Sequence, residues 1–95
     1  MAGYLIAMIE VTDPEQYAKY MAETPGVIAK FGGRFIVRGG EKVTLEGPDE
    51  NRRLALVEFP SLERAKAFYN SEDYQETKRL REGAATVSII AVEGV

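Results

Sequence analysis

Arg38, Glu58 and Glu10 are the residues of this 95-residue chain that best suit chemistry on a carbonyl compound. Arg38 ends a short apolar segment just before Gly39-Gly40, and a guanidinium there could clamp a carboxylate or an enolate through paired hydrogen bonds. A carboxylate held in an apolar cavity can act as a general base, so Glu58 or Glu10 could remove a proton next to a carbonyl. The structural alternative is an ion pair between Arg38 and either glutamate on a neighbouring strand.

The segment over residues 69–74 carries a second group of candidates. It brings three hydroxyl groups and one amide together, and it interrupts a helical pattern. Ser71 could contribute to a ligand site, or it could cap the helix that follows, a position that serine favours. Tyr74 and Arg81 fall on one side of that helix, where they could bind a ligand or pack in a subunit interface.

Tyr17 is the remaining candidate for binding a ligand. It lies with Tyr20 on an amphipathic helix, and aromatic residues at this spacing usually belong to a core. A tyrosine hydroxyl that points into a cavity could instead orient a ligand or donate a proton to it.

The chain contains no Cys, His or Trp. Their absence excludes disulfides, thiol nucleophiles, Ser-His and Cys-His dyads and His-ligated haem. Only carboxylates remain as metal ligands, and the adjacent pairs Asp49-Glu50 and Glu72-Asp73 lack the spacing of a calcium loop. We therefore predict that the protein binds no metal and uses no cofactor.

Charge and hydropathy narrow the range of partners. The net charge is −3 and the isoelectric point is about 5.0, which is unfavourable for binding a phosphate polyanion. The apolar run over residues 4–9 is too short to span a bilayer, and it lacks the basic flank and cleavage site of a signal peptide. We predict a cytoplasmic protein that binds neither nucleic acid nor membranes.

The elements that must position these residues follow the order β-α-β-β-α-β. Apolar and β-branched runs predict strands over residues 4–11, 34–38, 53–59 and 86–92. Residues 39–52 are a long connection, of which residues 42–45 could extend the strand ladder. This order predicts an α+β, ferredoxin-like fold in one domain over residues 1–95, with a four-stranded antiparallel sheet and helices on one face.

The predicted helices have clear start and stop signals. The first helix begins at the Asp13 cap and ends at Gly32-Gly33, with a kink or a break at Pro25. The second follows the Ser61 cap, and a further helical piece covers residues 72–81.

Alternation along the strands assigns their residues to two faces. The all-apolar sets are expected to face the helices: Leu5, Ala7, Ile9, Val11, Phe35, Val37, Ala55, Val57 and Phe59. The open face then mixes Tyr4, Ile6, Met8, Ile36, Leu54 and Leu56 with Glu10, Arg34, Arg38 and Glu58. Because so apolar a face should not be left to water, we expect a homodimer packed sheet to sheet, with the charged residues lining a cavity or the rim of the interface.

The segments TDPEQYAKY, FGGRFIVRGG, LEG, EFPS and FYNSEDYQETKRLREGA resemble the DUF1330 family of small proteins, roughly over residues 3–94. That family belongs to the dimeric α/β-barrel (ferredoxin-like) superfamily, so the resemblance implies a homodimer whose two sheets form a barrel-like core. It implies no particular reaction. The superfamily includes cofactor-free monooxygenases, muconolactone-isomerase-like enzymes and stress-response barrels. Its haem-degrading branch typically uses a His ligand that this chain lacks. The resemblance also draws attention to Ser71, Tyr74 and Arg81, which stand in the most family-like stretch.

Two functional hypotheses follow. In the first, a homodimeric enzyme or binder acts without a cofactor on a small carbonyl- or carboxylate-bearing metabolite, with Arg38 as anion clamp and Glu58 or a tyrosine in the proton role. The alternative is a non-catalytic structural or stress-associated homodimer. The first requires a cavity for a ligand, whereas the second predicts a filled core. RNA binding is a third possibility, but residues 53–59 do not match the exposed aromatic pattern of an RRM strand.

Overall fold

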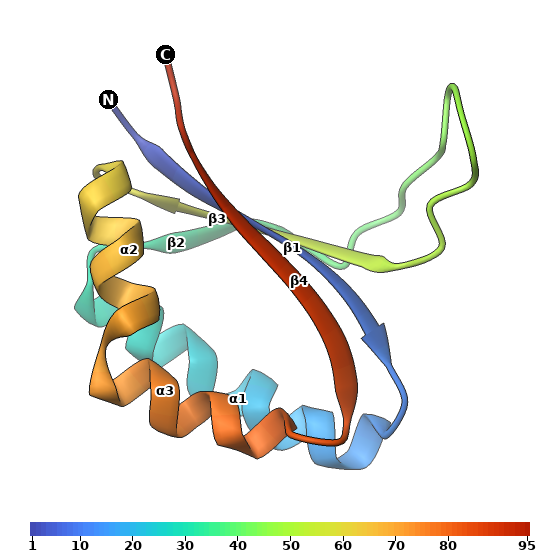
Figure 1. The fold of residues 1–95 in the computed structure, drawn as a ribbon, viewed down its shortest axis with the longest axis horizontal. Coiled ribbons are helices and arrows are strands. Elements are labelled where there is room, and N and C mark those ends of the chain that lie inside the picture. The colour runs from blue at the N-terminus through green and yellow to red at the C-terminus, as the bar shows by residue number, and fades with distance from the viewer.

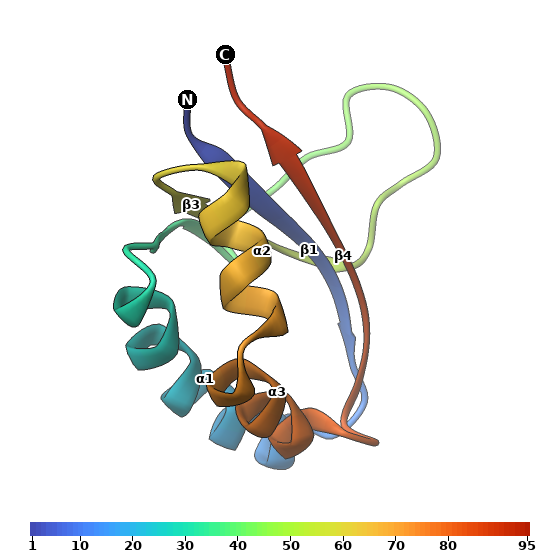
Figure 2. The same cartoon turned by 60° about the vertical axis from the view of Figure 1, so that its left-hand side comes forward.

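The computed structural model describes residues 1–95, and its four strands form one antiparallel sheet in the order β2-β3-β1-β4 (Figure 1). The elements are, in chain order, β1 (Gly3–Val11), α1 (Pro14–Lys30), β2 (Arg34–Arg38), β3 (Arg53–Phe59), α2 (Leu62–Asn70), α3 (Glu72–Lys78), the short 3-10 helix η1 (Arg79–Arg81) and β4 (Ala85–Glu93). The helices cover one face of the sheet and leave the other open (Figure 2). This confirms the predicted α+β, ferredoxin-like fold.

Local sequence explains where α1 begins and ends. The Asp13 side chain accepts a hydrogen bond from the backbone N–H of Gln16 at 3.3 Å, and Pro14 occupies the first helical position. Gly32 follows the helix with a φ of +76°, a conformation that other residues rarely adopt. The helix runs through Pro25 as a single element, so the break predicted as one of two outcomes there does not occur.

Serine caps set the limits of α2 and α3. Ser61 Oγ accepts a hydrogen bond from the N–H of Arg64, and Ser71 Oγ accepts one from the N–H of Tyr74, both at 3.1 Å. Ser71 also donates its hydroxyl to the carbonyl of Phe68 at 2.7 Å, so it closes α2 and opens α3. The predicted helical piece over residues 72–81 is confirmed as α3 followed by η1.

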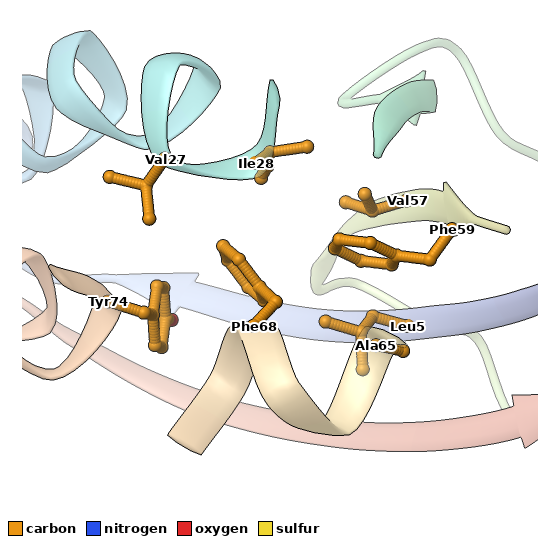
Figure 3. Packing of buried hydrophobic residues seen from close by; sticks show 8 residues of the cluster. All are labelled: Leu5, Val27, Ile28, Val57, Phe59, Ala65, Phe68 and Tyr74. Carbon is orange, nitrogen blue, oxygen red and sulfur yellow. The ribbon is translucent and has the colours of Figure 1, made fainter. Parts of the chain in front are cut away.

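The core lies between the helices and the sheet. Phe59, Phe68 and Tyr74 are each at most 3% exposed, and the centroid of the Phe68 ring lies 5.2 Å from that of Phe59 and 4.6 Å from that of Tyr74. Leu5 from β1 and Ile28 from α1 close on these rings from the two layers (Figure 3). Burying one such side chain stabilises the fold by about 1.5–3 kcal/mol. The packing of these rings is therefore a main reason that the helices stay bound to the sheet.

A bulge in β2 changes which residues of that strand face the helices. The strand pairs Phe35 with Val57 but then Val37 with Leu56, so one residue is extra and the alternation shifts. The predicted faces of β1 and β3 are correct, but those of Val37 and Arg38 are wrong. Val37 lies on the open face with Leu56, and Arg38 lies on the helix face with Ala55.

The connection over residues 39–52 contains no strand, so the proposed extension of the ladder by residues 42–45 does not form. The loop projects from the body of the molecule (Figure 1). Its base is held by Arg52, which donates to the Glu50 carboxylate at 2.7 and 2.9 Å, and by the Thr44 hydroxyl, which accepts from the N–H of Glu50. Val43 and Leu45 are 76% and 90% exposed on this loop.

Candidate functional site

A cavity of about 60 Å³ lies between α1 and the helix-facing side of the sheet. Its wall is mostly apolar. The polar side chains at its edge come from four elements: Tyr17, Tyr20 and Thr24 of α1, Arg38 of β2, Arg53 of β3 and Tyr74 of α3. A cavity needs about 10–15 Å³ for each water, so this one has room for about four to six water-sized groups.

Two of these groups, Tyr20 and Tyr74, form a connected cluster with Arg81, which stands next to the cavity. The hydroxyls of Tyr20 and Tyr74 lie 2.7 Å apart, and Nη2 of Arg81 lies 3.5 Å from the Tyr74 hydroxyl, at the limit of hydrogen-bond distance. The Arg81 guanidinium also stands 5.3 Å from the centre of the Tyr20 ring. The predicted candidates Tyr74, Tyr17 and Arg81 are therefore brought together, with Tyr20 as the link between α1 and α3.

Burial determines the protonation state of the tyrosines. It raises the pKa of Tyr74 far above the usual range, and the hydroxyl of Tyr20 adds to this while Arg81 opposes it. Burial also raises the pKa of Tyr17, against the positive charges of Arg81, Arg53 and Arg38. Both hydroxyls are therefore neutral at pH 7, so they can donate hydrogen bonds to a ligand oxygen but cannot act as bases.

Arg38 contacts the helix rather than the predicted carboxylates. Its Nη2 donates to the carbonyl of Met21 at 2.8 Å, and its guanidinium stacks 4.4 Å from the centre of the Phe35 ring. Pro25 has no N–H, so the carbonyl of Met21 lacks its usual partner in the helix. The guanidinium supplies the missing donor. The predicted ion pair of Arg38 with Glu58 or Glu10 is wrong because the bulge turns Arg38 to the other face.

The two carboxylate candidates lie on the open face, away from the cavity. Glu58 accepts a hydrogen bond from the Tyr4 hydroxyl at 3.2 Å and pairs with Arg34 at 3.0 Å. Glu10 is exposed near the end of β1, opposite Thr86 of β4. The predicted set of an arginine and two carboxylates is therefore not assembled in one place.

Ser71 is engaged as a cap between two helices, as the structural alternative for this residue predicts. Arg53 was not among the predicted site residues, yet it lines the cavity and its guanidinium packs against Gly39, where a Cβ would lie 2.7 Å from Cζ. The alternation of residues in β3 could have identified Arg53 from the sequence. Alternation puts Arg53 in the set with Ala55, Val57 and Phe59, where it is the one charged residue.

A groove of about 410 Å³ adjoins the cavity, between α2, α3 and the edge strand β4. Its rim carries Lys66, Lys78 and Arg81, and Lys78 Nζ donates to the Tyr69 hydroxyl at 3.2 Å. The cavity and the groove together are lined by five of the 12 basic residues of the chain and by none of its 15 acidic residues. In an acidic protein, this distribution favours an anionic ligand on the sheet side of the helices.

No group of three carboxylates is placed where it could hold a metal ion. No helix combines the length and the apolar character needed to cross a bilayer.

The architecture is shared by dimeric ferredoxin-like proteins in solved structures. A protein of unknown function from Rhodopseudomonas palustris is 20% identical, with 99% of this chain and 82% of that chain covered and a TM-score of 0.77. A dimeric ferredoxin-like protein of unknown function from Jannaschia sp. CCS1 is 15% identical, with 99% and 100% covered and a TM-score of 0.73. SnoaB, a cofactor-independent oxygenase from Streptomyces nogalater, is 10% identical, with 99% and 93% covered and a TM-score of 0.70. At these identities the likeness shows the fold alone.

The chain belongs to the DUF1330 family, a domain of unknown function, which matches residues 2–95. This confirms the family resemblance of the sequence motifs. No curated protein matches the chain.

Proposed function

We propose that this protein is a homodimer that binds a small carbonyl- or carboxylate-bearing metabolite in the cavity beneath α1 and acts on it without a cofactor. The observation that carries the proposal is the cluster of Tyr20, Tyr74 and Arg81 at a cavity whose wall is mostly apolar. Phenol hydroxyls and a fixed positive charge, set in a medium of low dielectric constant, are suited to holding an oxyanion.

The groups at the cavity favour one kind of chemistry. A ligand oxygen can receive hydrogen bonds from the Tyr74 or Tyr20 hydroxyl while Arg81 stabilises its negative charge. No carboxylate lines the cavity, since Glu10 and Glu58 lie on the opposite face. The proposed role is therefore to stabilise a carboxylate or an enolate oxygen, and a carboxylate base is not part of it.

The fold is compatible with catalysis that needs no cofactor. SnoaB, whose architecture is similar, is a cofactor-independent oxygenase. This is an analogy of fold at 10% identity, so the proposal takes from it the cofactor-free character and no substrate.

The dimer is supported by the composition of the open face and by the solved relatives. Ile90 and Val92 are 54% and 45% exposed on that face, beside the partly exposed Ile6 and Leu56. Apolar surface of this kind marks an interface. Two of the similar structures are described as dimeric ferredoxin-like proteins.

The second candidate function is a non-catalytic structural homodimer. Two observations favour it. The hydroxyls of Tyr20 and Tyr74 satisfy each other, and Arg38 is used by the helix backbone. Packing alone could account for these contacts.

Titration of isotope-labelled protein with acetate and pyruvate, followed by NMR, separates the two functions. We expect shifts of the amide signals of Tyr17, Tyr20 and Tyr74. Arg81→Gln should weaken binding about tenfold to a hundredfold, because a hydrogen bond to a charged group is lost, and Tyr74→Phe about threefold to tenfold. Glu10→Gln, on the other face, is the control and should bind as the wild type does. Equal binding in all four proteins, or none, would support the structural function.

A further inference from the structure

We propose that the groove between α2, α3 and β4 is the outer half of the same site, separated from the inner cavity by Arg81, and that the ligand is an amphipathic carboxylate. Its apolar body would lie along β4, and its carboxylate would meet Arg81 and Lys78. This inference rests on the proposed function, because it takes the tyrosine cluster as the inner end of the site.

The two spaces share a floor, and Arg81 stands where they meet. Leu5 and Ile89 line both the cavity and the groove. Tyr20 and Tyr74 line the cavity only, whereas Arg81 lines the groove only and contacts both tyrosines. The guanidinium of Arg81 therefore forms the boundary between the two.

Arg81 is weakly held for an arginine at such a boundary. Its hydrogen bond to Tyr74 is 3.5 Å long, and its buried Nε has no partner. By contrast, Arg52 makes hydrogen bonds of 2.7 and 2.9 Å to one carboxylate. A carboxylate in the groove would provide Arg81 with the paired acceptors it lacks, and turning toward that carboxylate would join the two spaces.

Size also indicates that the cavity is not the whole site. Small-molecule sites usually enclose about 300–1,000 Å³. The inner cavity, at about 60 Å³, is far below this range, while the groove, at about 410 Å³, is within it. A ligand whose carboxylate lies at Arg81 would need the groove for its body.

The lining of the groove identifies the chemical class of the ligand. Val87, Ile89 and Ala91 give it an apolar wall along β4. Lys66 is paired with Glu63 at 2.9 Å, whereas Lys78 makes no ion pair and donates to the Tyr69 hydroxyl at 3.2 Å. Arg81 and Lys78 are thus the cations available to an anion beside an apolar wall, which is the pattern that an amphipathic monocarboxylate complements.

A series of straight-chain carboxylates tests the proposal by calorimetry and NMR. The probes are acetate, hexanoate and decanoate, with decan-1-ol as the uncharged control. Each buried methylene adds about fourfold in affinity, so decanoate should bind at least about tenfold tighter than acetate. Ala91→Trp fills the groove and should abolish this gain. Ala67→Trp, on the exposed side of α2, is the matched control and should keep the gain.

A charge variant covers the case in which Ala91→Trp fails to fold. Lys78→Glu should weaken decanoate at least about tenfold and leave decan-1-ol unchanged, whereas Lys42→Glu, on the projecting loop, should change neither. A gain with chain length that survives Ala91→Trp, or decanoate binding that is unchanged in Lys78→Glu, would overturn the outer half of the site, as would decan-1-ol binding as tightly as decanoate. In both cases acetate binding that depends on Arg81 would leave the proposed function standing. Failure of the whole series to bind would overturn both.

Discussion

Tyr74 places a hydroxyl group in the core, where Tyr20 and Arg81 are its hydrogen-bond partners. A buried hydroxyl without a partner would cost about 1–3 kcal/mol, so these contacts are needed for the fold whatever else they do. Burial keeps this phenol neutral, and the same contacts keep it aligned at the cavity. One residue can thus serve packing and ligand binding, which is why substitutions at Tyr74 must be read by binding and stability together.

The raised pKa of Tyr74 predicts how its contribution to stability changes with pH. Burial raises the pKa in the folded state above the unfolded value near 10. The contribution is therefore complete below about pH 10 and is lost as the pH rises toward the folded pKa, because the unfolded chain releases the proton first. Urea unfolding of wild type and Tyr74→Phe should show the wild type losing stability more steeply above pH 10. Parallel profiles for the two proteins would contradict this.

At the scale of elements, the bulge in β2 and the proline in α1 act as a pair. The bulge turns Arg38 toward the helix, and Pro25 leaves the Met21 carbonyl free to accept its hydrogen bond. The edge strand is thereby attached to the middle of α1 over the cavity. Neither feature alone would explain why α1 tolerates a proline in its interior.

A double-mutant cycle tests this pairing. Arg38→Met should lower the free energy of unfolding by about 1 kcal/mol in the wild type, because the Met21 carbonyl loses its donor. In a Pro25→Ala background the restored N–H of residue 25 takes that carbonyl, so the same substitution should cost less than about 0.5 kcal/mol. Chemical denaturation of the four proteins gives both values. Equal costs in the two backgrounds would show that Arg38 and Pro25 act independently.

The helix caps and the positions of the strands could be predicted from the sequence because they depend on local chemistry. Asp13 and Ser71 act as caps through side chains that reach only three residues along the chain. The bulge could not be predicted from the sequence, because the residues of β2 still alternate in a regular way. The extra residue becomes visible only in the pairing of β2 with β3. For this reason strict alternation predicts Arg38 on the open face with Glu58 and Glu10, whereas the pairing with β3 turns it to the helix face.

At the scale of the whole molecule, the two faces of the sheet have different roles. The helix face carries the core, the cavity and the groove, with Arg38, Arg53 and Arg81 at their edges. The open face carries apolar side chains, with the Arg34–Glu58 ion pair at its end. Because a dimer formed through the open face leaves the groove side free, ligand binding and self-association should be separable by mutation.

Ile90→Glu tests the dimer at the open face. Ile90 is 54% exposed in one subunit, so a glutamate there should leave the fold intact, but in a sheet-to-sheet interface it would bury an unpaired charge. We expect sedimentation equilibrium to give twice the chain mass for the wild type and the mass of one chain for the variant at the same concentration. Ala67→Glu, on the exposed side of α2, is the control and should remain dimeric. A variant that keeps the doubled mass would place the interface elsewhere, and a wild-type monomer would leave the open face without a partner. Acetate binding should survive in the Ile90→Glu monomer, because the tyrosine cluster and Arg81 come from one chain.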